Sequence, residues 1–129
     1  DPKGRVNFPA KLREDLGDSF IICKGLDNCL YVYRMSEWDK LVEKTSALPS
    51  SKARTIQRFF FASAVCCEPD KQGRVLIPQT LRDYAGLTGE IAVIGVSTRA
   101  EIWDSARWDE ANAALTSESV AETMEELGF

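Results

Sequence analysis

Hydrophobic and polar positions alternate in two short segments of the chain, residues 5–8 and 74–77. An alternation with a period of two predicts a β-strand that has one buried and one exposed face. A proline follows each segment and suits the first turn of a helix, where the missing N–H has no helical partner to lose. A glycine then closes each predicted helix, at Gly17 and at Gly86.

The rest of the hydrophobic pattern predicts further elements in the same order in both halves. Two β-rich runs separated by a turn indicate a hairpin, over residues 19–34 in the first half and 90–103 in the second. Each hairpin leads into a helix that carries a tryptophan. The remaining predicted elements are a connecting helix over residues 52–62, a strand over 64–68 and a terminal helix from Ser119.

The two halves also share residue identities, which indicates a tandem duplication of about 70 residues. Shifting the chain by 69 positions matches eight of the first 17 residues with identical ones, including Asp1, Gly4 and Arg5 with Asp70, Gly73 and Arg74. We divide the chain into a first repeat (1–48), a connecting helix (49–62), a second repeat (63–115) and a C-terminal acidic helix (116–129). Because a strand precedes Asp70, the same symmetry predicts about one strand of native sequence ahead of Asp1.

Composition and charge narrow the classes of function. The chain is 44% hydrophobic and 28% charged, as expected of a soluble globular protein, and no apolar run is long enough to cross a membrane. The net charge of −4 hides an uneven distribution, since residues 1–100 carry +3 and residues 101–129 carry −7. A local basic surface for nucleic acid is therefore compatible with the acidic total.

Candidate catalytic chemistry is sparse. There is no histidine, which removes the Ser-His and Cys-His nucleophile arrangements and the commonest metal ligand. The four cysteines show no C-x-x-C spacing, and the adjacent Cys66 and Cys67 point to opposite faces of a strand. We expect reduced thiols in a cytoplasmic protein, with no metal, no cofactor and no enzymatic activity. A Cys-dependent enzyme is the alternative, although no base for it is apparent.

The sequence D-x-x-G-R, which occurs once in each repeat, is the candidate functional motif. Its aspartate can pair with the arginine or accept backbone N–H groups, and its glycine can supply a backbone angle that side chains forbid. Arg5 and Arg74 then leave the strand opposite the valines and point to solvent. Arginine forks match guanine edges and phosphate oxygens, although a purely structural ion pair is also compatible with the motif. Further basic residues lie near the two motifs: Lys3, Lys11, Arg13, Lys71 and Arg82.

The duplicated motif, inside Gly-Arg-Val-x-apolar-Pro, resembles the MraZ family of bacterial transcriptional regulators, most closely in "FASAVCCEPDKQGRVLIPQTLRDYAGL". The resemblance implies an α+β fold, in which tandem AbrB-like units form a pseudo-twofold swapped-hairpin (double-split) β-barrel flanked by helices. It also implies a nucleoid-associated, ring-shaped homo-oligomer that represses the division and cell-wall gene cluster by binding promoter direct repeats in double-stranded DNA. An AbrB- or MazE-like protein-interaction module or antitoxin is the alternative.

The resemblance also implies roles for individual residues. The main DNA contacts would come from Arg5 and Arg74, with Lys3 beside Arg5. The other basic residues near the motifs are further candidate contacts: Lys11, Arg13, Lys71 and Arg82. The residues that would shape the loops are Asp1, Gly4, Asp70 and Gly73. The family usually has a lysine before the glycine, so Gln72 is a departure that predicts weaker DNA contact by the second loop.

Overall fold

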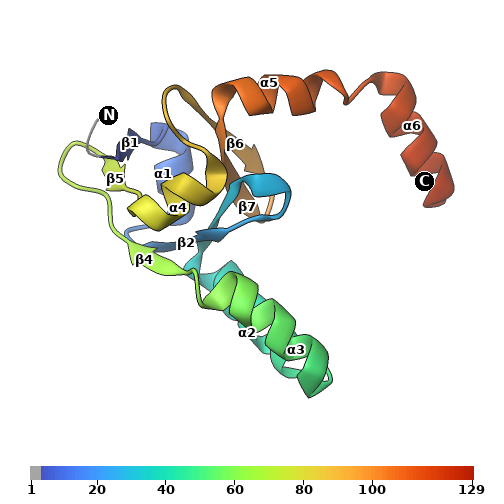
Figure 1. Ribbon diagram of the computed structural model, residues 1–129, viewed down its shortest axis with the longest axis horizontal. Helices are drawn as coiled ribbons and strands as arrows, with labels where there is room; N and C mark the ends of the chain where they lie inside the picture. Colours follow the sequence, from blue (N-terminus) through green and yellow to red (C-terminus); the bar gives the residue numbers. More distant parts are fainter. Residues whose placement is uncertain (1–3) are drawn as a thin grey trace.

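The computed structural model describes residues 4–129 and shows two helical arms projecting from a body of strands (Figure 1). The first repeat contains β1 (Arg5–Asn7), α1 (Ala10–Leu16), β2 (Phe20–Lys24), the 3-10 turn η1 (Leu26–Asn28), β3 (Leu30–Arg34) and α2 (Met35–Ser46). The connection consists of α3 (Ser50–Ile56) and the π-helical turn η2 (Gln57–Phe61). The second repeat contains β4 (Val65–Cys67), β5 (Arg74–Leu76), α4 (Gln79–Ala85), β6 (Ile91–Val96), β7 (Arg99–Asp104) and α5 (Ser105–Ala113), and α6 (Ser117–Glu126) follows.

The strands form two antiparallel sheets, and each sheet combines strands of both repeats. The larger sheet has the order β4-β2-β3-β7-β6, and the smaller sheet, which we call the ribbon, pairs β1 with β5. The α+β class expected from the sequence is confirmed. Over residues 4–129 the strands do not close into a barrel, so the swapped-hairpin barrel is not confirmed. Both ribbon strands end shortly before a proline, which has no N–H with which to extend a ladder.

The larger sheet is buried on both faces near its centre. One face meets the ribbon, α1 and α4 through fully buried apolar side chains, among them Phe20, Ile22, Leu30, Val32 and Ile102. The opposite face meets aromatic residues of α2, η2 and α5 through Cys23, Tyr31 and Trp103. This coverage explains why β2 and β3 are almost continuously apolar in sequence.

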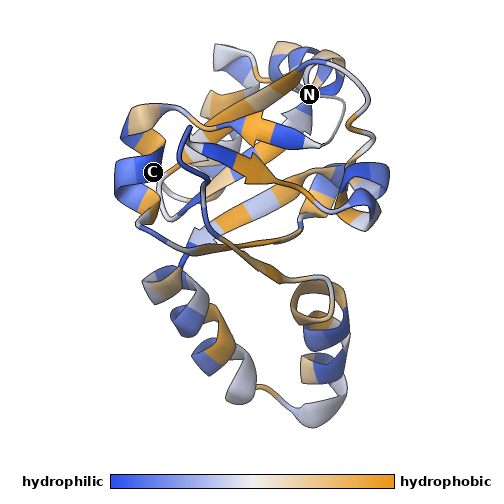
Figure 2. Cartoon of the chain, turned by 90° about the vertical axis from the view of Figure 1, so that its left-hand side faces the viewer, coloured by the Kyte–Doolittle hydropathy of each residue, from blue (hydrophilic) through white to orange (hydrophobic). Residues whose placement is uncertain are grey.

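The connecting helix expected over residues 52–62 is formed by α3, which starts at Ser50, and by η2, which ends at Phe61. Together with α2 it forms the first arm, a helical hairpin that extends away from the strands (Figure 2). The second arm consists of α5 and α6 and ends at the C-terminus (Figure 1). No helix within residues 4–129 is long and apolar enough to span a membrane.

One edge of the larger sheet differs from the other. The strand β2 is flanked by β4, whereas its counterpart β6 forms the sheet edge in the part of the chain that the structure describes. The strand expected ahead of Asp1 would be the counterpart of β4 in the first repeat, and it stays a prediction.

Candidate nucleic-acid interface

The ribbon places the arginines of the two D-x-x-G-R motifs on neighbouring strands. Its register pairs Val6 with Val75, Arg5 with Leu76, and Asn7 with Arg74. Since positions 5 and 74 are equivalent in the two repeats, a pseudo-twofold axis passes between the two valines. Both valines pack on the main core. Because side chains alternate along a strand, the other four ribbon residues lie on the outward face: Arg5, Asn7, Arg74 and Leu76.

The second motif forms a tight turn that is organised by Asp70. The backbone N–H groups of Gln72 and Arg74 each donate to Asp70 Oδ1 at 2.9 Å, and Arg74 Nε donates to Oδ2 at 3.0 Å. These bonds, chiefly the one from the Arg74 N–H, lower the pKa of the Asp70 carboxyl below its ordinary value. The ionised carboxylate thus shapes the turn and restrains the direction of the Arg74 side chain.

The glycines of the two motifs, Gly4 and Gly73, are each covered by the other repeat. Gly4 and Gly73 share a φ of +79°, which L-residues rarely adopt. A Cβ on Gly4 would lie 2.6 Å from the guanidinium carbon of Arg82, and a Cβ on Gly73 would lie 2.5 Å from Nη1 of Arg13. Each glycine is therefore favoured by its backbone angle, and a side chain there would also displace the guanidinium of the other repeat.

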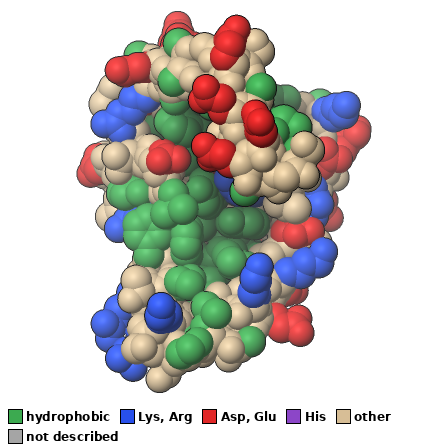
Figure 3. Space-filling view, turned by 90° about the vertical axis from the view of Figure 1, so that its right-hand side faces the viewer, with side chains coloured by type: hydrophobic (Ala, Val, Ile, Leu, Met, Phe, Trp, Pro, Cys, Tyr) green, Lys and Arg blue, Asp and Glu red, His purple; other side chains and the backbone are tan. Residues whose placement is uncertain are grey.

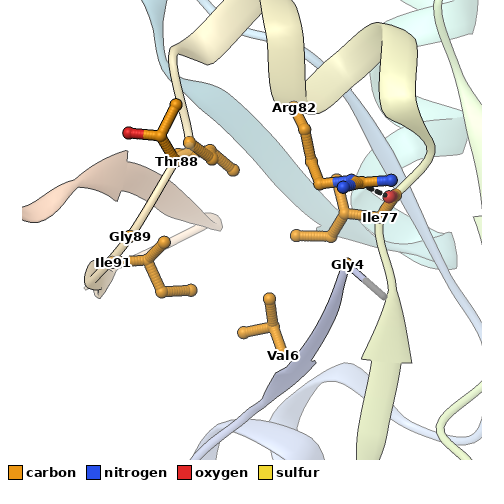
Figure 4. Close-up of a pocket in the computed structure, with 8 residues that line it drawn as sticks. Gly4, Val6, Ile77, Arg82, Thr88, Gly89 and Ile91 are labelled. Atoms are coloured by element: carbon orange, nitrogen blue, oxygen red, sulfur yellow. Dashed lines mark hydrogen bonds between the residues drawn. The ribbon is translucent and has the colours of Figure 1, made fainter. Parts of the chain in front are cut away.

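The same two arginines are anchored on backbone carbonyl groups of their own repeats. Arg82 Nε donates to the Ile77 carbonyl at 2.8 Å (Figure 4), and Arg13 Nε donates to the Phe8 carbonyl at 3.1 Å. Each arginine thus starts on a helix of one repeat, bonds to a carbonyl of that repeat and lies against the glycine of the other. A cavity of about 470 Å³ lies beside Arg82, between the ribbon and residues 87–91, which include the start of β6 (Figure 4).

The structure brings some of the predicted DNA-contacting residues together and separates others. Arg5 and Arg74 lie on the outward face of the ribbon, where both are half-buried. Lys71 is exposed in the second turn, and Lys11 is exposed on α1. All four are within reach of an external ligand, because none of them is enclosed by the core.

The remaining predicted residues are in different settings. Arg13 and Arg82 take part in the contact between the repeats, so their guanidinium groups already hold protein groups. Asp1 and Lys3 lie outside the described residues. The loop-shaping role of Asp1 and the DNA contact of Lys3 therefore stay predictions.

Asn7 and Leu76 also lie on the outward face and were missed as candidate site residues. Both are exposed, and each lies opposite an arginine of the neighbouring strand. The alternation at residues 5–8 and 74–77 was the signal that could have found them, since it places them on the same face as Arg5 and Arg74. Glu90 borders this face, because it lines a cavity of about 300 Å³ with Arg5, Asn7 and Arg74.

Three of the four thiols are poorly suited to catalysis. Burial raises the pKa of Cys23 and of Cys29 to about 12, and that of Cys67 to about 11. Thiols with such pKa values are protonated at neutral pH and react slowly as nucleophiles. Cys66 is exposed. Among residues 4–129, no group of three or more Cys, Asp or Glu side chains is arranged to hold a metal ion.

Comparison with known proteins identifies relatives over the whole chain. The family model of the MraZ protein, described as antitoxin-like, matches twice, over residues 1–59 and 60–127. Proteins named transcriptional regulator MraZ from Caldicellulosiruptor bescii and Acetivibrio thermocellus are 54% and 51% identical to this chain. Both alignments cover 100% of this chain and 93% of the relative. The chain belongs to the MraZ family, as the resemblance of its duplicated motif predicts.

Proposed function

We propose that this chain is a transcriptional regulator that binds double-stranded DNA through the outward face of the ribbon. Its relatives are named transcriptional regulators. The observation that carries the proposal is the ribbon register, which displays Arg5 and Arg74 on one face about a pseudo-twofold axis. A DNA duplex has a local twofold axis between its strands, so two equivalent arginines can meet equivalent groups on the two strands.

The dimensions of the ribbon suit the major groove. Neighbouring strands lie about 4.8 Å apart, and the groove of B-DNA is about 12 Å wide and admits a two-stranded ribbon. Arg5 and Arg74 can bind guanine or phosphate bidentately, and the exposed Lys11 and Lys71 can add phosphate contacts. Arg13 and Arg82 contribute by holding the turns from which the two ribbon arginines project.

We also propose that the chain forms a homo-oligomer through its two arms. A broad apolar patch lies between the arms, with acidic side chains above it (Figure 3). The helix α6 carries four glutamates and no basic residue, and its apolar positions Val120 and Met124 are exposed. The opposite charge lies on α3 and η2, where the exposed residues include Lys52, Arg54 and Arg58. Complementary arms on one molecule favour a head-to-tail contact with a second copy, and such contacts close into a ring when the rotation permits.

A ring would present several ribbons to DNA at fixed spacing. One ribbon makes few contacts, but linked ribbons on successive direct repeats bind with a higher combined affinity. Occupation of a promoter would then repress it by excluding the polymerase. The family resemblance supports the division and cell-wall gene cluster as the target, and a nucleoid-associated cytoplasmic location.

The DNA-binding proposal is tested with Arg5→Ala and Arg74→Ala. Each variant is titrated, over a salt series, with a fluorescent duplex from the region upstream of the chain's own gene. Each substitution should weaken binding about tenfold and lower the salt slope by about one, because a bidentate contact and a neutralised phosphate are lost. Lys44→Ala, a matched change of charge on an exposed residue of α2, should bind like the wild type. Wild-type affinity in the double arginine variant, with an unchanged thermal melt, would refute the proposal.

The description of the family as antitoxin-like supports one alternative, in which the apolar side of α6 binds a different protein. Light scattering on the full chain distinguishes the two possibilities. A wild-type mass at a multiple of 14.4 kDa, reduced in a V120S/M124S variant, supports self-association. A monomeric wild type favours the alternative partner.

A further inference from the structure

The outward face of the ribbon is symmetric in its arginines and asymmetric in its other two side chains. The pseudo-twofold axis exchanges Arg5 with Arg74, which are identical, and Asn7 with Leu76, which differ. Both of the differing residues are exposed, and Leu76, which is 56% exposed, is the one apolar side chain among the four outward residues of the ribbon. Each arginine therefore lies opposite a different chemical neighbour, since Asn7 faces Arg74 and Leu76 faces Arg5.

The two differing side chains would select different base edges. An asparagine amide can bind adenine bidentately through N6 and N7 in the major groove, whereas a leucine can make only apolar contact, for which the thymine methyl group is the matching partner. Side chains two residues apart on a strand are separated by about 6.7 Å, which is about two base-pair steps of 3.4 Å. Arg5 and Asn7 would therefore address base pairs about two steps apart, as would Arg74 and Leu76.

We infer that Asn7 and Leu76 determine which bases are bound. They also give a direction to the short DNA sequence bound by one ribbon, which we call the box. The inference rests on the DNA-binding function proposed above. Two identical halves would prefer a palindromic box, because the symmetry of the site mirrors that of the protein. Here the arginines contact equivalent groups in both halves, while Asn7 selects adenine in one half and Leu76 selects thymine in the other. The box is non-palindromic, and the chain binds it in one orientation.

A directional box also matches the head-to-tail association of the arms. Successive copies in such an assembly present their ribbons in the same orientation. Boxes that each have a direction can then be read only when they run the same way along the duplex. The difference between Asn7 and Leu76 thus links the reading of one box to the arrangement of several.

The test is selection from a pool of duplex DNA with a randomised central segment, using the full chain. The wild type should enrich a non-palindromic box. Asn7→Leu places a leucine at both outward positions, so it should enrich a palindrome in which both halves are of the kind that Leu76 selects. Leu76→Asn should enrich a palindrome in which both halves are of the kind that Asn7 selects. Each variant should lose about tenfold in its preference for the wild-type box. The matched control is Leu26→Asn in η1, which changes a leucine that is 55% exposed and lies off the ribbon, and it should select the wild-type box.

The double variant N7L/L76N reports on orientation. An iron chelate attached to Cys66, which is exposed and lines a cavity with Leu76, should cut the duplex nearer one end of the box. The double variant should recover the wild-type box and move the cut to its other end. A palindromic box for the wild type, or the same box for both single variants, overturns the inference and leaves DNA binding intact. A wild type that enriches no duplex at low salt refutes the proposed function, and this inference with it.

Discussion

Replacing Gly73 by alanine tests the contact through which one repeat holds the turn of the other. Gly73 has a φ of +79°, and an L-residue in this region is strained by about 1–2 kcal/mol. The new Cβ would lie 2.5 Å from Nη1 and 2.7 Å from Cζ of Arg13, so the guanidinium must move. The movement breaks the 3.1 Å bond to the Phe8 carbonyl, which contributes about 0.5–1.5 kcal/mol. We expect Gly73→Ala to lower the free energy of unfolding by about 2–3 kcal/mol.

A double-mutant cycle separates strain from collision. Arg13→Ala alone removes the same hydrogen bond and should cost about 1 kcal/mol. That bond is already lost in Gly73→Ala, so the double variant should be about as stable as Gly73→Ala, which is a coupling of about 1 kcal/mol. The assay is urea unfolding followed by tryptophan fluorescence at one fixed protein concentration, because association changes apparent stability.

Lys44→Ala supplies the control, because Lys44 is exposed on α2, which belongs to the first arm and not to the turn. The cost of Gly73→Ala should add to that of Lys44→Ala. If the Gly73 cycle is also additive, to within about 0.3 kcal/mol, the contact between the repeats does not stabilise the turn and the reasoning is refuted.

Four further predictions concern the turn, the thiols and the second arm. Asp70→Asn should weaken DNA binding about tenfold in a fluorescence titration, because the charged acceptor for Arg74 Nε is lost, and unchanged affinity would contradict a shaping role. The hydrogen bonds lower the pKa of the Asp70 carboxyl in the folded chain, so they stabilise the fold fully above its ordinary pKa. This stabilisation is lost as the pH falls through the folded pKa. An NMR titration should place the midpoint of the Asp70 carboxyl below its ordinary pKa. Iodoacetamide at pH 7 should alkylate one thiol of the native chain, Cys66, and all four thiols after unfolding. Mass spectrometry counts the added groups. More than one added group in the native chain would contradict the burial of the other three thiols. Removing residues 117–129 should reduce the mass measured by light scattering and leave the unfolding of the strand body unchanged, because α6 is exposed; an unchanged mass would exclude α6 from the association.

The sequence was sufficient for the elements that depend on local signals. The alternation at residues 5–8 and 74–77 predicted the two ribbon strands, and the prolines and glycines that follow predicted α1 and α4. The period of two also predicted which side of the ribbon faces outward. These signals suffice because strand alternation and helix ends are set by neighbouring residues, and the duplication presented each of them twice.

The pairing of the two motifs could not be derived in the same way. β1 and β5 are 69 residues apart, so their contact depends on how the halves dock rather than on local preference. The position of Arg13 and Arg82 over the glycine of the other repeat depends on the same docking, so no local signal predicted it. Their predicted contact with DNA stays a prediction. A residue identity shared by two repeats indicates a common role, but not whether that role is to bind a ligand or to hold a turn.

The pattern of identity between the repeats follows from this division of roles. Gly4 and Gly73 both have positive φ, and against each lies an arginine of the other repeat that bonds to a carbonyl of its own repeat. We expect a change at either glycine or either arginine to disturb this packing between the repeats. The side chains of Asn7 and Leu76 are not among the closest neighbours of either glycine. Those two positions could diverge without loss of the fold, and under the proposed function they are the positions at which divergence changes the DNA that is read.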